Sequence, residues 1–260
     1  MTAVDTQTIH RVMHEIKRRR LQVLRVVDLT PRMRRITLGG PELAGFISLG
    51  TDDHVKLLFP QNAEQTAALA TMVLGGKNEG PMPEMRDYTP RRYDLDTLEL
   101  DIDFVLHGDG PASTWAEQAT PGQFLHIGGP RGSMIVPDIF DSYLLIGDET
   151  ALPAIARRLE GMAANRKALV VIEVENGAEQ QTLESAAQVN VIWVLREGGT
   201  DNLLTTVKQL QVPKGNLYAW VATETKVSRQ IRRVLLDEHG LDDKLVKAVG
   251  YWRAEGSEEE

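Results

Sequence analysis

The first half of the chain alternates short apolar and polar stretches, whereas the second half repeats continuous apolar runs. Alternation with a period of two is typical of strands that bury one face. Six such strands are expected before residue 128, with one helix ahead of the last: strands 21–27, 33–38, 54–59, 86–93, 97–106 and 123–127, and helix 112–118. Turn-forming residues separate these segments, as in Gly39-Gly40-Pro41. The pattern predicts a small closed antiparallel barrel of six strands.

After Pro137 the pattern changes to apolar strands that alternate with helical segments. Strands buried on both faces read as continuous apolar runs, and their alternation with helices is typical of a parallel sheet covered on both sides. The expected strands are 143–147, 168–173, 191–195, 217–222 and 244–252, and the expected helices are 152–162, 182–187, 203–210 and 227–239. The fold class expected is therefore β plus α/β, with a barrel domain first and a parallel-sheet domain second.

The domain limits follow from these changes of pattern. We expect a lead-in segment at 1–20, a barrel domain at 21–138, an α/β domain at 139–254 and a disordered acidic tail at 255–260. Residues 61–84 are rich in Ala, Gly and Pro without a clear period, and we expect a long excursion there. Excursions of that length in compact domains are usually functional or mobile.

Composition narrows the classes of function. The 260 residues are 42% hydrophobic and 25% charged, as in an ordinary globular protein, and no run of about 18 apolar residues predicts a membrane span. The chain has no cysteine, which excludes disulfides, thiolate chemistry and cysteine-bound metal, and no other metal site is expected. A net charge of −8 argues against a nucleic-acid binder. We expect a cytoplasmic, monomeric protein whose redox chemistry, if any, depends on an organic cofactor.

Candidate chemistry is concentrated between residues 85 and 133. An arginine and two hydroxyl side chains occur in Arg86-Asp87-Tyr88-Thr89, and Gly110-Pro111-Ala112-Ser113 has the composition of a helix start. Backbone N–H groups and the positive dipole end at a helix start hold phosphate groups, and arginine binds phosphate in a bidentate manner. These segments predict a site for a ligand with a pyrophosphate and a long polar arm.

Five segments in order resemble one family: RDYTPR, DFVLHGDGPASTWA, GGPRGS, GDETALPAIARRLE and a terminal GYWR. This array resembles the siderophore-interacting proteins, which are FAD-dependent ferric-siderophore reductases of the ferredoxin–NADP reductase superfamily. The resemblance extends from Leu21 to Arg253. It implies FAD as cofactor, NADPH or NADH as electron donor and a ferric siderophore as substrate. In this interpretation the flavin carries the chemistry, so no catalytic side chain is assigned.

The resemblance also implies which residues hold FAD. Arg86 would bind the FAD phosphates, Tyr88 would pack along the flavin, and Thr89 would form a hydrogen bond near its reactive nitrogen. The remaining expected contacts are Asp103, His107, Gly108, Pro111, Ala112, Ser113 and Arg131. Two alternatives stay open, because His107 could be a strand-end histidine bound to backbone and Trp115 could be a core residue or cover the adenine.

The nicotinamide nucleotide is assigned to the second domain by the same resemblance. There is no Gly-x-Gly-x-x-Gly fingerprint, and the residues implied are Asp148, Glu149, Thr150, Ala151 and Glu224. An alternative is that Asp148 or Thr150 caps a helix. Relatives often have Gly-Glu where this chain has Thr223-Glu224, so close approach of the nucleotide to the backbone is in question. Arg196 is a weak indication of a preference for NADPH.

A basic pocket is expected for the substrate, because many ferric siderophores are anionic. The residues implied are Lys56, Arg131, Arg253 and Trp252, and the alternative is three unrelated surface cations. The function expected is transfer of electrons from NAD(P)H through FAD to Fe(III), with release of Fe(II) from the siderophore. The alternatives are a redox-silent siderophore-binding module and a general flavin reductase of the diaphorase type.

Overall fold

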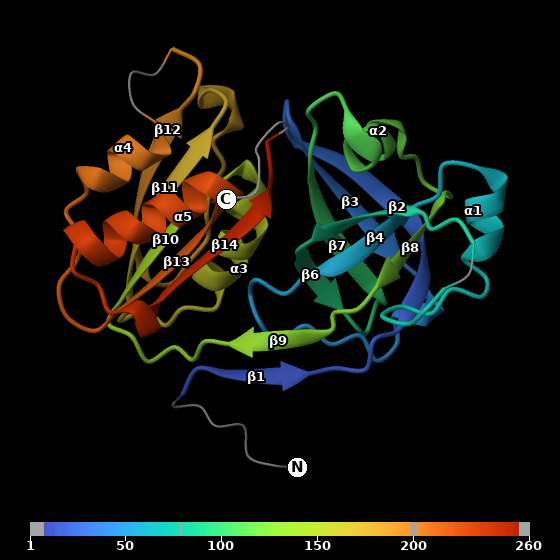
Figure 1. The fold of residues 1–260 in the computed structure, drawn as a ribbon, viewed down its shortest axis with the longest axis horizontal. Coiled ribbons are helices and arrows are strands. Elements are labelled where there is room, and N and C mark those ends of the chain that lie inside the picture. The colour runs from blue at the N-terminus through green and yellow to red at the C-terminus, as the bar shows by residue number, and fades with distance from the viewer. Residues whose placement is uncertain (1–7, 79, 199–201, 255–260) are drawn as a thin grey trace. The chain divides into compact units, whose positions relative to one another are not determined.

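The structure is a computed structural model that describes residues 8–78, 80–198 and 202–254 (Figure 1). The chain forms two compact units, Met1–Val136 and Pro137–Glu260. The expected acidic tail at 255–260 lies outside the described residues. Within the described ranges, no helix combines the length and apolar character needed to cross a membrane.

Unit 1 is built on an antiparallel sheet of seven strands in the order β5-β4-β8-β2-β3-β7-β6. These strands are β2 (Arg18–Thr30), β3 (Met33–Gly39), β4 (Val55–Phe59), β5 (Glu84–Tyr88), β6 (Pro90–Asp94), β7 (Glu99–Val105) and β8 (Phe124–Gly128). The expected number of six was wrong, because the segment 86–93 forms two strands that separate at Thr89. Pro90 has no N–H to donate to a ladder, so it is suited to the first position of an edge strand.

The two edge strands of this sheet are consecutive in the chain. β5 ends at Tyr88 and β6 begins at Pro90, so Thr89 alone joins one edge of the sheet to the other. The sheet must therefore curl, and it forms a half-barrel instead of the closed barrel expected. The concave side is filled by a single core cluster that includes Leu21, Ile36, Leu57, Ile102 and Ile127, all fully buried.

Helix α2 (Gly110–Gln118) covers one part of this core with its small residues. Ala112 is 5% exposed and Ala116 is fully buried, and both belong to the core cluster of the half-barrel. The helix contacts β4 and β7. Its first turn is therefore held beside the ends of the strands that carry the candidate residues.

Two segments expected to be irregular contain regular structure. In the lead-in, β1 (His10–Met13) pairs with β9 (Gly132–Ile135) in a two-stranded ribbon, and β2 begins at Arg18. In the excursion 61–84, helix α1 (Ala63–Ala68) begins at the Asn62 cap, whose side chain accepts a hydrogen bond from the Gln65 N–H. Leu69 and Met72 then pack on Leu58 of β4.

Unit 2 is a parallel sheet in the order β12-β11-β10-β13-β14 (Figure 1). Its strands are β10 (Ser142–Asp148), β11 (Lys167–Val174), β12 (Gln188–Leu195), β13 (Leu217–Glu224) and β14 (Val246–Trp252). Its helices are α3 (Leu152–Glu160), α4 (Leu203–Lys208) and α5 (Thr225–Arg233), with a π-turn at Val234–Glu238 and short 3-10 turns at Pro41–Leu43 of unit 1 and at Glu149–Ala151, Gly177–Glu179 and Asp243–Leu245. The strands expected from the apolar runs are all present.

The helix expected at 182–187 was wrong, since this segment is irregular. The Ser185 hydroxyl donates to the Leu159 carbonyl oxygen at 2.7 Å, and a side-chain bond of this kind competes with helical hydrogen bonding.

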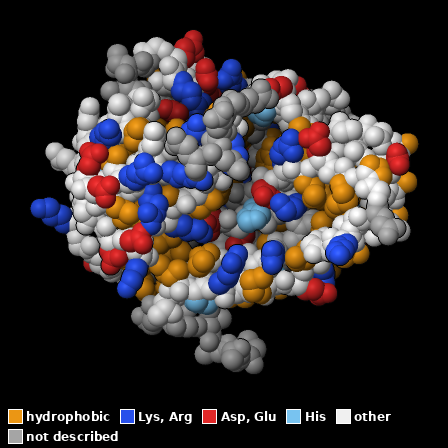
Figure 2. All heavy atoms as spheres, in the orientation of Figure 1, with side chains coloured by type: hydrophobic (Ala, Val, Ile, Leu, Met, Phe, Trp, Pro, Cys, Tyr) orange, Lys and Arg blue, Asp and Glu red, His pale blue; other side chains and the backbone are white. Residues whose placement is uncertain are grey.

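Helices α4 and α5 share one apolar cluster with strands β10, β11, β13 and β14. On the outer side of α5, Lys226, Arg229 and Arg233 are exposed. Figure 2 shows Lys and Arg side chains gathered over this helix, although the whole chain is acidic.

Candidate functional site

The first group of candidate residues lies where the chain passes from one edge of the half-barrel to the other. Arg86 and Tyr88 are on β5, opposite Leu57 and Val55 of β4. Thr89, 6% exposed, is the connecting residue. The Arg86 side chain is 48% exposed and donates to the Glu84 carboxylate at 2.8 Å. Because β5 is an edge strand, this guanidinium can exchange Glu84 for an incoming anion without breaking the sheet.

Tyr88 begins a series of aromatic contacts that leads to helix α2. Its ring packs on Phe104 with a centroid distance of 4.6 Å, and Phe104 packs on Trp115 at 5.7 Å. Trp115 in turn packs on Phe59 at 6.0 Å. Burial raises the pKa of the Tyr88 phenol well above its ordinary value, although the nearby Arg86 charge opposes this shift. Tyr88 is therefore a neutral aromatic surface.

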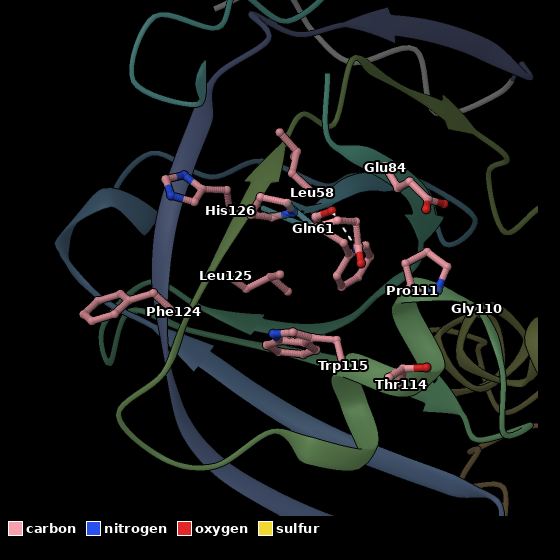
Figure 3. Close-up of a pocket in the computed structure, with 12 residues that line it drawn as sticks. Leu58, Gln61, Glu84, Gly110, Pro111, Thr114, Trp115, Phe124, Leu125 and His126 are labelled. Carbon is pink, nitrogen blue, oxygen red and sulfur yellow. Dashed lines mark hydrogen bonds between the residues drawn. The ribbon is translucent and has the colours of Figure 1, made fainter. Parts of the chain in front are cut away.

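A cavity of about 510 Å³ lies at the end of this aromatic series. It is lined by the first turn of α2 and by the ends of β4, β5 and β8: Leu58, Phe59, Pro60, Gln61, Glu84, Gly110, Pro111, Thr114, Trp115, Phe124, Leu125 and His126. In Figure 3 Trp115 and Gln61 lie on one side of β8, and the side chains of Phe124 and His126 lie on the other. Trp115 thus belongs to the core and to the cavity wall.

The loop before α2 presents backbone N–H groups near this cavity. Gly108 and Gly110 have φ of 83° and 74°, the left-handed region in which glycine is favoured. The Asp109 carboxylate, at the N-cap, contacts His107 Nδ1 at 2.5 Å, and the N-cap has no side-chain cap hydrogen bond. The Ser113 hydroxyl accepts from the His107 N–H at 3.0 Å and is fully buried. This loop therefore presents mainly backbone groups to the cavity.

Asp103 alternates with the core residues Ile102 and Phe104, so it lies on the face of the sheet opposite the core, where arginine engages it. Arg35 on the neighbouring β3 donates to both carboxylate oxygens of Asp103, at 2.7 and 2.8 Å. The Asp103 side chain is only 4% exposed. A paired, buried carboxylate of this kind links two strands, so its contribution to the site is to hold β3 against β7.

The glycine-rich turn after β8 brings two of the expected cations into one region. Arg131 is exposed. Lys56 pairs with Gly128 in the β4–β8 ladder, and Gly128 precedes Arg131 by three residues. Lys56 donates to Asp87 at 2.8 Å. The buried Arg19 donates to the Gly129 carbonyl oxygen at 3.2 Å, and burial lowers the pKa of Arg19. Arg19 therefore supports this turn through a buried hydrogen bond to its backbone.

In unit 2, the expected nucleotide residues lie at the carboxyl ends of the strands, where ligands bind in open α/β sheets. Asp148 ends β10 and is 1% exposed. Its Oδ1 accepts from the Thr150 N–H and hydroxyl, and its Oδ2 accepts from Thr223 Oγ1 and Trp252 Nε1, both at 2.7 Å. A Cβ on Gly147 would lie 2.4 Å from Ala151 Cβ, so this turn requires glycine.

Glu149 is bound by Arg196, which follows β12. Arg196 donates to both carboxylate oxygens at 2.6 and 2.8 Å, and its Nε donates to Glu173 at 3.0 Å. Burial lowers the pKa of Arg196, but hydrogen bonding and the charges of Glu149, Glu173 and Asp148 outweigh burial and raise it. Glu173 also accepts from the Leu203 N–H at the start of α4. The cluster of Glu149, Arg196 and Glu173 therefore joins the carboxyl ends of β10, β11 and β12 to the start of α4.

Glu224 differs from Asp148 and Glu149 in having an unused acceptor. It is 7% exposed, and its Oε2 accepts from the N–H groups of Lys226 and Val227 at the start of α5. Its Oε1 is buried and has no hydrogen-bond partner within the described part of the chain. Glu224 pairs in register with Trp252, a residue that is 43% exposed, and Arg253 follows.

Several contributors were not identified from the sequence. Glu84 holds Arg86, Phe104 links Tyr88 to Trp115, and Thr223 donates to Asp148. Only Thr223 had a usable signal, since it is a polar residue at the end of an otherwise apolar strand.

Comparisons with known proteins agree on one family. The chain is 39% identical over 249 residues to the NADPH-dependent ferric-chelate reductase of Escherichia coli, with 94% of this chain and 96% of the relative covered. It is 32% identical to the ferric vibriobactin reductase of Vibrio cholerae, with 93% and 91% covered. A siderophore utilization protein from T. fusca has a solved structure that matches with a TM-score of 0.85 and 38% identity, covering 96% of this chain and 98% of that one.

Family models match both units. Residues 22–134 match the siderophore-interacting FAD-binding domain. Residues 140–255 match the siderophore-interacting protein domain. With both matches in sequence order and relatives that align over nearly their whole length, the chain belongs to the siderophore-interacting protein family.

Proposed function

We propose that this protein is a flavin-dependent ferric-siderophore reductase that takes electrons from NADPH or NADH. The observation that supports this function most is that one cavity is lined by the first turn of α2, by Glu84, which binds Arg86, and by Trp115, to which Tyr88 is linked through Phe104. FAD, when bound, accepts two electrons from a nicotinamide and releases them singly, which a one-electron acceptor such as Fe(III) requires. Ferrous iron binds hard oxygen chelators less tightly than ferric iron, so reduction favours its release.

The residues of unit 1 fit FAD. Arg86 can exchange the exposed Glu84 carboxylate for a phosphate, and the backbone N–H groups of Gly110, Ala112 and Ser113 can donate to the same pyrophosphate. Tyr88 offers a neutral aromatic ring next to Thr89, and the cavity wall formed by Trp115 can accept an aromatic group. Ser113 and Asp103 are engaged within the protein, so we assign them to supporting these elements.

The residues of unit 2 fit a nicotinamide nucleotide at the carboxyl ends of β10 and β13. Glu224 Oε1 is the best candidate for direct recognition, because a buried acceptor without a partner gains most from a hydroxyl or amide donor. Asp148 and Glu149 already accept several hydrogen bonds each, and we assign them to shaping the site. Ala151, fully buried, belongs to the packed turn.

For the substrate we propose an anionic ferric siderophore attracted by Lys56 and Arg131 of unit 1 and, independently, by Arg253 of unit 2. A cleft lined by one sign of charge raises local substrate concentration even in a protein of opposite net charge. We also propose that the protein works as a monomer in the cytoplasm, where nicotinamide nucleotides are available. Size-exclusion chromatography with light scattering tests the oligomeric state.

The test is anaerobic reduction of a ferric siderophore by the FAD-loaded protein, with Fe(II) captured by a chromogenic chelator. NADPH and NADH are supplied separately, and several ferric chelates are compared with an organic diaphorase acceptor. A ferric-siderophore reductase is expected to show a flavin spectrum and Fe(II) production that depends on enzyme, nucleotide and chelate.

Other outcomes separate the alternatives. A colourless protein that binds a ferric siderophore and gains no flavin on incubation with FAD would indicate a redox-silent binding module. Rapid reduction of the organic acceptor together with equally slow reduction of every ferric chelate would indicate a general diaphorase.

A further inference from the structure

The Asp148 carboxylate is already saturated by donors from its own unit. A carboxylate has about four acceptor positions. In Asp148 these are used by the Thr150 N–H and hydroxyl on Oδ1 and by Thr223 Oγ1 and Trp252 Nε1 on Oδ2. With 1% of the residue exposed, a nucleotide could contact this carboxylate only by displacing one of them.

Trp252 is held in place at both its backbone and its side chain. The Thr225 hydroxyl donates to the Trp252 carbonyl oxygen at 2.9 Å, and Trp252 Nε1 donates to Asp148 at 2.7 Å. Gly250 and Trp252 pair with Thr223 and Glu224, so Tyr251 is an extra residue in the ladder. Such a bulge re-aims the side chain that follows it. A Cβ on Gly250 would lie 2.4 Å from Thr225 Oγ1, so glycine is required for this approach.

These restraints leave an aromatic ring that is fixed and still accessible. The Trp252 residue is 43% exposed although its N–H is bound to a buried charge. It lies beside Glu224, the residue with the unused acceptor oxygen. A side chain that is ordered before binding does not have to be immobilised when the ligand arrives, and this improves affinity.

We infer that Asp148 is a positioning residue that holds the Trp252 indole as a rigid aromatic wall of the nicotinamide nucleotide site. The inference rests on the proposed function of unit 2 as a nucleotide-binding domain. Asp148 itself does not contact the nucleotide. The planar ring of Trp252 does, with its face towards the nicotinamide or ribose and Glu224 Oε1 as the neighbouring acceptor.

The substitution Asp148→Asn separates positioning from direct contact. Each carboxylate oxygen faces one donor that cannot become an acceptor, the Thr150 N–H on one side and the Trp252 N–H on the other. An asparagine has only one side-chain oxygen, so its amide group must oppose one of these donors. In the Trp252→Phe background this conflict disappears, because the amide can then donate to the Thr223 hydroxyl.

The first measurement is the set of indole N–H resonances in FAD-loaded protein labelled with ¹⁵N tryptophan. The chain has four tryptophans, and Trp252→Phe identifies the resonance of Trp252. We expect this resonance to be protected from solvent exchange, and to move and lose protection in Asp148→Asn while the other three stay in place. Thr223→Val removes the other donor to Oδ2 and is the matched control, expected to leave the Trp252 resonance protected.

The second measurement is the dissociation constant of NADP⁺. We expect Asp148→Asn to raise Kd about five- to tenfold, Trp252→Phe to raise it several-fold, and the double variant to be no weaker than Trp252→Phe alone. Thr223→Val should stay within twofold of wild type. An equal rise in Kd from Asp148→Asn in both backgrounds would mean that Asp148 contacts the nucleotide, and it would overturn the inference.

A raised Kd for NADP⁺ in Asp148→Asn while the Trp252 resonance stays unchanged would also overturn the inference. If Asp148→Asn does not fold, Trp252→Phe decides, because a Kd within twofold of wild type would show that pinning the ring has no role. If the wild-type protein does not bind NADP⁺ or NAD⁺, the proposed function of unit 2 fails. The resonance would still report whether Asp148 holds Trp252.

Discussion

Arg196 donates to both carboxylate oxygens of Glu149, at 2.6 and 2.8 Å, across 47 residues of sequence. The pair joins the turn after β10 to the end of β12, and Glu173 on the strand between them accepts from the same guanidinium. An acidic turn that was assigned to nucleotide contact is therefore also part of the framework of the sheet edge. The Arg196–Glu149 pair thus places Glu149 among the residues that shape the site and not among those that are available to a ligand.

Replacing Glu149 should lower the free energy of unfolding, because Glu149 is part of the framework of the sheet edge. Glu149→Ala removes one partner from a pair that is 10% exposed on the Glu149 side and 33% exposed on the Arg196 side. After a discount for this exposure, we expect a loss of about 1–3 kcal/mol in the free energy of unfolding. Urea unfolding followed by circular dichroism measures it. The exposed pair Lys17–Glu15 is the control, and Glu15→Ala should change the midpoint very little.

Replacing Arg86 should weaken FAD binding and leave the fold unchanged. A charge-assisted hydrogen bond contributes about 1.5–3 kcal/mol, so Arg86→Ala should raise the Kd of FAD about tenfold or more. Flavin fluorescence during titration of apoprotein gives the Kd. Arg92→Ala removes a similarly exposed arginine from β6, the edge strand that follows β5 in the chain, and should have little effect. An unchanged Kd for Arg86→Ala would refute the assignment.

Replacing Asp103 should lower stability and leave FAD binding unchanged, the reverse of the result expected for Arg86. Asp103→Asn weakens the two-point contact with Arg35 in a site that is 4% exposed, and we expect the free energy of unfolding to fall by about 1–3 kcal/mol. The Kd of FAD in the folded variant should stay within about twofold. Loss of FAD with unchanged unfolding would instead show that Asp103 is a ligand residue.

Acid should destabilise the half-barrel partly through His126. Burial lowers the pKa of His126, and the charges of Arg18 and Arg20 lower it further. The unfolded chain, in which a histidine titrates near pH 6.5, therefore takes up the proton first, and stability falls as the pH drops below that value. Urea unfolding between pH 7.5 and 5.5 should have a smaller pH slope in His126→Gln. Identical slopes in both proteins would contradict this account.

Lys56, beside the glycine-rich turn of unit 1, and Arg253, at the end of β14 in unit 2, should each affect reduction of anionic substrates. Lys56 is partly neutralised by Asp87, so Lys56→Ala should slow reduction of an anionic ferric chelate and Asp87→Asn should accelerate it. Arg253→Ala should also slow it. Both losses should shrink at high ionic strength. The rate of Fe(II) capture is measured with anionic and neutral chelates side by side. Equal losses on both would mean that these cations hold structure or cofactor.

The sequence alone was sufficient for most of the strands and helices, although β1, α1 and β9 were not expected. Apolar periodicity is a local property, and it located strands such as β3 and β10 and helices α3 and α5 to within a few residues. Periodicity failed where the same local pattern is compatible with two different structures. One continuous strand was expected through Thr89, and a helix was expected at 182–187, where the structure has an irregular segment.

Which polar groups remain available to a ligand was decided only by the tertiary structure. Asp148, Glu149 and Glu224 are equivalent in sequence, as acidic residues at the ends of apolar strands. Asp148 meets Trp252 across 104 residues, Glu149 meets Arg196, and Glu224 retains one oxygen without a partner among the described residues. A side chain's partners depend on which strands become neighbours and at what register, and no local periodicity contains that information.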